Sequence, residues 1–204
     1  MFRTISIIGF LVTFFSIGIC CMAFPCCKKC QWSPIAILKR TVHLLAMLRL
    51  ERKLGPVSAL RKLIYLLAML CFLGLVITGF YPALFLQESI TGYWLTLHTV
   101  FAPVFAACLA LLAVMWAANC TFNKDDWLYP RIRGNGLLRK ICFWLIVLLA
   151  LPVILSIMLS MFSVFGTQGQ NFLLQLHRYS ALILALVIIV HTYLTIRGRM
   201  GSEL

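Results

Sequence analysis

The sequence predicts an all-α integral membrane protein with five membrane-spanning helices. Hydrophobic residues make up 63% of the chain, charged residues only 11%, and the mean hydropathy is +1.01, which is far outside the range of soluble domains. Five apolar stretches are each long enough to cross a bilayer. The net charge of +13 comes from Lys and Arg residues that gather between these stretches. That distribution follows the positive-inside rule of membrane proteins and shows no basic and aromatic patch of the kind that binds nucleic acid.

The first apolar stretch covers residues 5–23 and is preceded by a single basic residue, Arg3. A signal peptide would need small residues at a cleavage site, and Gly18-Ile19-Cys20 does not provide that pattern. We therefore expect an N-terminal transmembrane helix within residues 1–24.

A basic segment, residues 25–60, follows this helix. From residue 25 to residue 62 the chain holds nine Lys and Arg residues against the single acid Glu51, so this segment should face the inside of the cell. Within it, residues 34–54 place apolar and cationic side chains on opposite faces, which predicts an amphipathic helix on the inner membrane surface that ends at Gly55-Pro56.

Four further spans are expected at about residues 63–81, 94–116, 141–162 and 172–196, with a kink at Pro103 in the second of them. The connection at residues 119–140 has an excess of basic residues, whereas the turn around Glu88 and the connection at residues 163–171 carry little or no charge. This alternation predicts an N-terminus outside the cell and a C-terminus inside it.

The last span carries two histidines, His177 and His191, which are fourteen residues apart. At about 100° and 1.5 Å per residue, both rings fall on one helix face, roughly 21 Å apart along the helix axis. Because histidine is costly to place in hydrocarbon, both are candidates for a functional site inside the bundle. Haem b, an apolar macrocycle whose iron binds imidazole, would suit two such sites at different depths. Alternatively, each ring only forms a structural hydrogen bond.

The topology also pairs the histidines by depth. His98 and His177 each lie a few residues past the outer start of a span, so they could bind one iron from opposite sides. His191 lies near the inner end, and its partner should come from the inner end of another helix.

Several segments resemble the cytochrome b subunit of formate dehydrogenases and nickel-iron hydrogenases, and the related bacterial di-haem cytochromes b. They are Arg61-Lys62-Leu63-Ile64-Tyr65, Leu75-Val76-Ile77-Thr78-Gly79, Leu97-His98, Arg139-Lys140-Ile141-Cys142-Phe143-Trp144, Leu176-His177-Arg178-Tyr179 and His191. The resemblance implies a four-helix cytochrome b core over residues 61–199, with His98 and His177 on an outer haem and His191 on an inner haem. It also implies that an iron-sulfur subunit docks at the outer face and that quinone exchanges near His191.

One departure from this family concerns the inner haem. The family usually begins its first core helix with Arg-x-x-His, whereas this chain has Ile64 at the histidine position. One alternative is that His43, which lies in an Arg-x-x-His sequence starting at Arg40, folds back toward His191. The other is that the inner haem is lost, or is held by His191 alone.

Two further groups of side chains are candidates for binding. Arg178, next to His177, could neutralise a haem propionate or could be an ordinary anchor at the membrane interface. Five cysteines lie at the inner end of the first helix, and Cys27 and Cys30 have a spacing that could bind zinc or an iron-sulfur cluster. Inert or lipidated thiols are the alternative, because no second well-spaced pair follows.

Together these features predict a haem b subunit, in the bacterial cytoplasmic (inner) membrane, that transfers electrons between a quinone pool and an iron-sulfur or cytochrome subunit of a respiratory complex. Chemistry at carbon or hydrogen would belong to another subunit of that oxidoreductase. A haem-poor or haem-free membrane anchor is the main alternative. A transporter or channel is a weaker one, because the spans offer few polar groups besides the histidines.

Overall fold

The computed structural model describes residues 1–23, 56–86, 90–122 and 136–200, and within these ranges the chain is helical with short connections and no strands. Five helices are long and apolar enough to cross a membrane: α1 (Phe2–Ala23), α3 (Pro56–Tyr81), α4 (Gly92–Ala117), α6 (Gly136–Ser160) and α7 (Gly166–Met200). The predicted fold class is confirmed. The amphipathic helix expected at residues 34–54, and with it His43, lies outside the described residues.

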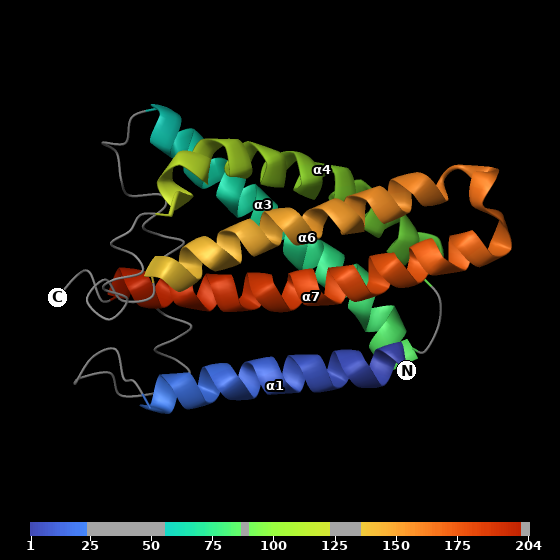
Figure 1. Ribbon diagram of the computed structural model, residues 1–204, viewed down its shortest axis with the longest axis horizontal. Helices are drawn as coiled ribbons and strands as arrows, with labels where there is room; N and C mark the ends of the chain where they lie inside the picture. Colours follow the sequence, from blue (N-terminus) through green and yellow to red (C-terminus); the bar gives the residue numbers. More distant parts are fainter. Residues whose placement is uncertain (24–55, 87–89, 123–135, 201–204) are drawn as a thin grey trace.

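The helices form two antiparallel hairpins, α3 with α4 and α6 with α7, and α1 lies along α7 (Figure 1). At the inner end, α4 and α6 are tied together by side chains of α6. Lys140 Nζ donates a hydrogen bond to the Thr121 carbonyl at 2.8 Å, and Trp144 Nε1 donates one to the Cys120 carbonyl at 3.0 Å. Here "outer" means the end at which α4 and α7 begin, following the predicted orientation.

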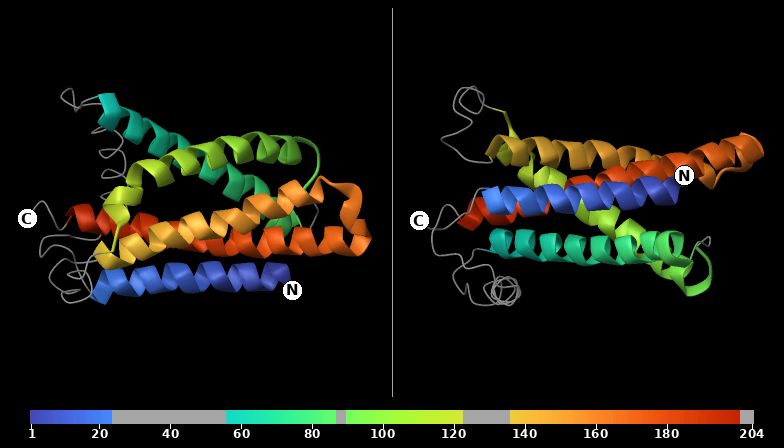
Figure 2. Two further views of the ribbon diagram at one scale, coloured as in Figure 1. Left: turned by 45° about the horizontal axis from the view of Figure 1, so that its top comes forward. Right: turned by 90° about the horizontal axis from the view of Figure 1, so that it is seen from below.

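Helix α1 runs parallel to α7. Near its start, the Phe2 ring packs edge-on against Tyr179 with centroids 5.4 Å apart, and near its end Cys21 Sγ lies 3.5 Å from Tyr193 Oη. Figure 2 shows α1 and α7 side by side, with both chains running in the same direction. This agrees with five crossings, because the first and fifth helices of such a bundle must point the same way.

Three helix boundaries differ from those expected. Helix α3 begins at Pro56, a residue whose fixed φ and missing N–H suit the first turn of a helix. Helix α6 spans Gly136–Ser160 rather than 141–162, and it contains Pro152. Helix α7 begins at Gly166, where a φ of +58° suits glycine, so polar residues before Phe172 that we expected in a loop are helical. Gln170 Nε2 holds that first turn by donating to the Phe162 carbonyl at 3.0 Å.

The interior is made of two apolar clusters, and the outward faces of the helices are apolar as well. One cluster, toward the inner end of the α3–α4 hairpin, consists of Ile64, Ala68, Cys108 and Leu112. The other joins the two hairpins through Ile146, Leu184 and Ile188, packed against residues that include Phe72 and Phe105. Large side chains such as Leu70, Leu148 and Phe15 remain well exposed, as expected for helices that face lipid.

Candidate functional site

The structure brings His98 on α4 and His177 on α7 together in the outer half of the bundle. Their ring centroids are 6.4 Å apart, and the ring planes are inclined at 77°. Both rings are partly buried. The two side chains come from different hairpins, so the pair lies where the α3–α4 and α6–α7 hairpins face each other.

The Nδ1 atom of His98 lies 3.0 Å from Thr78 Oγ1 on the neighbouring helix α3. Thr78 is almost fully buried, and its hydroxyl proton forms a hydrogen bond to the Gly74 carbonyl at 2.7 Å. Because that proton is already used, the hydroxyl oxygen must accept from His98. His98 therefore carries its proton on Nδ1, and its Nε2 atom is left with a free lone pair.

His177 is fixed in the same tautomer by helix α6. Its Nδ1 atom lies 3.0 Å from the carbonyl oxygen of Val153, which can only accept a hydrogen bond. Ser156 Oγ is farther from Nδ1, at 3.5 Å, and donates to the same carbonyl at 3.0 Å. Both members of the pair therefore keep Nδ1 protonated, and each has Nε2 available as a metal ligand.

Two glycines of α3 allow the close approach that positions His98. A Cβ atom on Gly79 would lie 3.2 Å from Cε1 of the His98 ring. One on Gly74 would lie 2.7 Å from Cδ2 of Phe101, which is three residues after His98 on α4. The absence of side chains at these positions lets α3 pack against the histidine-bearing face of α4.

The separation of the two rings fits the chemistry of an iron with two axial imidazoles. Two imidazoles on opposite sides of one metal, each bonded at about 2 Å through Nε2, have ring centroids roughly 6 Å apart. The observed 6.4 Å matches this separation. The hydrogen-bonded Nδ1–H groups supply the orientation that metal-bound histidines usually require. His98 and His177 therefore fit the chemistry of a haem b iron, which they would bind through Nε2.

Polar groups that are buried within the described part of the bundle gather at this same level. The four buried polar side chains come from four helices and are Ser6, Thr78, Ser156 and Ser180. Ser180 Oγ donates to the backbone of the turn that contains His177. Arg178 follows His177 on α7 and is partly buried, and its contact with a haem propionate stays a prediction.

His191 is placed differently. It lies near the inner end of α7, against the backbone of Arg139 at the start of α6. Its Nδ1 atom is buried, and no hydrogen-bond partner for it is found among the described residues. His43, the partner that we considered for it, lies outside those residues.

The cysteines that suggested a second metal site are only partly described. Cys20 and Cys21 end helix α1, while Cys26, Cys27 and Cys30 fall outside the described residues. The described part of the chain contains no group of three or more His, Cys, Asp or Glu side chains that could bind a metal.

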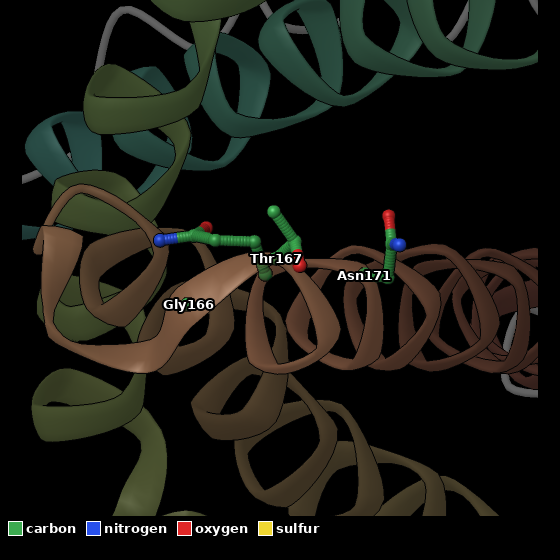
Figure 3. Close-up of a pocket in the computed structure, with 4 residues that line it drawn as sticks. Gly166, Thr167 and Asn171 are labelled. Carbon is green, nitrogen blue, oxygen red and sulfur yellow. The ribbon is translucent and has the colours of Figure 1, made fainter.

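An open pocket of about 500 Å³ lies at the outer start of α7, lined by Gly166, Thr167, Gln170 and Asn171. Figure 3 shows Thr167 and Asn171, one helical turn apart, projecting from the same side of the helix. The pocket includes neither histidine of the pair.

Three of the residues that build the site were not identified from the sequence, namely Thr78, Gly79 and Val153. Thr78 and Gly79 stand in a segment that resembles the cytochrome family, but nothing in their spacing assigns them to His98. A backbone carbonyl such as that of Val153 has no sequence signal at all.

Two imidazoles brought together by membrane-crossing helices are the arrangement expected of a membrane cytochrome of the b type. The model of the prokaryotic cytochrome b561 family matches residues 57–203, and the chain belongs to this family. No curated protein and no solved structure matches the chain. Helix α1 lies outside the matched residues.

Membership in this family identifies a multi-pass prokaryotic membrane protein of the haem b electron-transfer class. It also agrees with the resemblance to the cytochrome b subunits of hydrogenases and formate dehydrogenases.

Proposed function

We propose that His98 and His177 are the two axial ligands of one haem b in the outer half of the membrane. We further propose that the chain passes electrons between a quinone pool and an iron-sulfur or cytochrome subunit of a respiratory complex. The observation that carries the proposal is the 6.4 Å separation of two imidazoles whose Nδ1 atoms are both held by acceptors on neighbouring helices.

The protein's own groups hold the site in a form ready to bind iron. The Thr78 hydroxyl and the Val153 carbonyl each accept a hydrogen bond from an imidazole Nδ1–H, which fixes the tautomer and increases the basicity of the nitrogen that would bind the metal. Bound haem supplies one-electron transfer between its ferric and ferrous states. Arg178 is suited to pair with a propionate near the interface, because a guanidinium matches the geometry of a carboxylate.

The outer position of the pair supports an outer docking face for the redox partner. The basic residues between the spans support an N-terminus outside and a C-terminus inside the bacterial cytoplasmic membrane. In this orientation, His98 and His177 lie close to the outer membrane face, where an external partner would exchange electrons with the haem.

The experiment that tests this proposal is the dithionite-reduced visible spectrum of purified protein, with a count of haem per chain. We expect a b-type spectrum in the wild type and loss of that haem in both His98→Ala and His177→Ala. Phe172→Ala, at a well-exposed residue near the same end of α7, serves as the control and should keep the haem.

A wild-type chain without haem, or single histidine variants that keep a full complement, would contradict the ligand assignment. A wild type without haem would instead favour a membrane anchor.

A further inference from the structure

We propose that this chain binds haem at the His98 and His177 pair alone, because Ile64 leaves the inner haem position without a ligand on α3. This inference rests on the proposed function, since it concerns the number of haems in the same electron path. It follows from the different surroundings of the two histidines of α7.

The inner position can be located from the outer site by helix geometry. His191 follows His177 by fourteen residues on α7, and Ile64 precedes Thr78 by fourteen residues on α3. Fourteen residues return to almost the same helix face about 21 Å farther along the axis. Because α3 and α7 run in opposite directions, Ile64 and His191 both lie toward the inner end, on the helix faces that carry Thr78 and His177 farther out.

Ile64 provides no ligand, and its surroundings are apolar. The side chain is only 8% exposed and packs in one cluster with Ala68, Cys108 and Leu112. Tyr65 and Trp116 cover this cluster, with ring centroids 5.8 Å apart. The position on α3 that corresponds in depth to His191 therefore holds a packed hydrophobic side chain, and among the described residues it offers no imidazole.

His191 is held differently from the outer histidines, because its ring lies within hydrogen-bond reach of the Arg139 backbone but not through Nδ1. His98 and His177 each donate a hydrogen bond from Nδ1 to an acceptor at 3.0 Å, which orients the ring for metal binding. The buried Nδ1 atom of His191 has no such acceptor among the described residues. The side chains that the structure describes at the inner level therefore do not fit a second bis-imidazole haem.

The consequence is an electron path that ends in the outer half of the membrane. A quinone that exchanges electrons with this chain must then approach the His98 and His177 level, and the inner side around His191 is not its site.

The test is the number of haems per chain in full-length protein, purified after growth with added haem precursor so that incomplete loading does not lower the count. We expect one haem per chain and a single one-electron wave in a redox titration. His191→Ala and His43→Ala should both keep that haem and that wave unchanged. His177→Ala, on the same helix face as His191, should lose it.

Two haems in the wild type, one of which disappears in His191→Ala or in His43→Ala, would overturn the inference and leave the outer site intact. If one of the two haems disappears in His43→Ala, His43 would be identified as the ligand that replaces the missing histidine at position 64. A wild type that binds no haem would defeat the proposed function itself, so the two failures are distinguishable.

Discussion

Thr78 Oγ1 accepts a hydrogen bond from Nδ1 of His98 across 3.0 Å, and the same hydroxyl donates to the Gly74 carbonyl one turn earlier on α3. This arrangement holds the imidazole of one helix by a side chain of the next. It makes the orientation of His98 a property of the α3–α4 hairpin rather than of α4 alone.

Replacing Thr78 with Val should therefore weaken the site while keeping the shape of the side chain. Loss of the acceptor leaves the Nδ1–H group unsupported and makes the iron-bound nitrogen less basic. We expect haem affinity to fall roughly 10- to 100-fold and the reduction potential to rise. Haem retention during dilution and a redox titration measure both effects.

The matched control for this change is Thr99→Val, because Thr99 is exposed and its hydroxyl donates to the carbonyls of Leu95 and Thr96 on its own helix. Equal haem affinity in Thr78→Val and Thr99→Val would show that the contact between Thr78 and His98 does not support the ligand.

Gly79→Ala should separate haem binding from helix stability. The new Cβ atom would lie 3.2 Å from Cε1 of His98, so the ring must move by a few tenths of an ångström. Alanine is the better helix former by about 1 kcal/mol, which offsets the cost of moving the ring, so the stability of the haem-free protein should change little, whereas haem affinity should fall. Thermal unfolding and haem titration of the same preparation check the two effects.

Gly18→Ala is the control for that experiment, because a Cβ atom at position 18 meets no atom within 4 Å. It should leave haem affinity unchanged. A Gly79→Ala protein that binds haem as tightly as Gly18→Ala would mean that α3 does not constrain the ring.

Ser6→Phe tests whether α1 is separable from the haem-binding core. Ser6 is completely buried, so a phenyl ring at this position cannot be accommodated without moving α1 away from its neighbours. We expect a loss of about 1 to 3 kcal/mol in stability with an unchanged haem count, since the family match begins only at residue 57. Ile8→Phe, on the exposed side of α1, should have little effect. A lost haem in Ser6→Phe would instead make α1 part of the site.

Ile64→His should reopen the inner position. Position 64 lies on the α3 face that carries Thr78 and at the depth of His191, so an imidazole there supplies the ligand that this level lacks. We expect the haem count to rise toward two, and to return to one when His191→Ala is added. Ile64→Val, which keeps the apolar cluster, should not raise the count. An additional haem that survives His191→Ala would show that position 64 and His191 do not form a pair.

The number and directions of the membrane-spanning helices could be predicted from the sequence. The side-chain contacts between these helices could not. Continuous apolar stretches and basic connections predicted the five helices, and the parity of their directions placed His98 and His177 at one level. The acceptors for these rings could not be predicted, because a hydroxyl on α3 and a carbonyl on α6 reach the histidines only through tertiary packing.

The predicted start of α7 was wrong by six residues, and the reason is again that tertiary structure is not visible in local sequence. Thr167, Gln170 and Asn171 have the polarity of a loop, but they form the helical extension of the α6–α7 hairpin beyond the rest of the bundle (Figure 2). Polar side chains indicate that a segment is exposed to water but do not indicate its secondary structure. A helix that projects from the apolar bundle can therefore have the same composition as a loop. The assignment of His43 remains a prediction, because this residue lies outside the described part of the chain.

Low-temperature electron paramagnetic resonance of the oxidised protein tests the central claim most directly, since it reports both axial ligands and the angle between their planes. With imidazole planes inclined at 77°, His98 and His177 should give a strongly anisotropic low-spin ferric signal. This signal should be lost in both His98→Ala and His177→Ala. A high-spin signal in the wild type, or a low-spin signal that survives either substitution, would contradict binding of one haem between these two histidines.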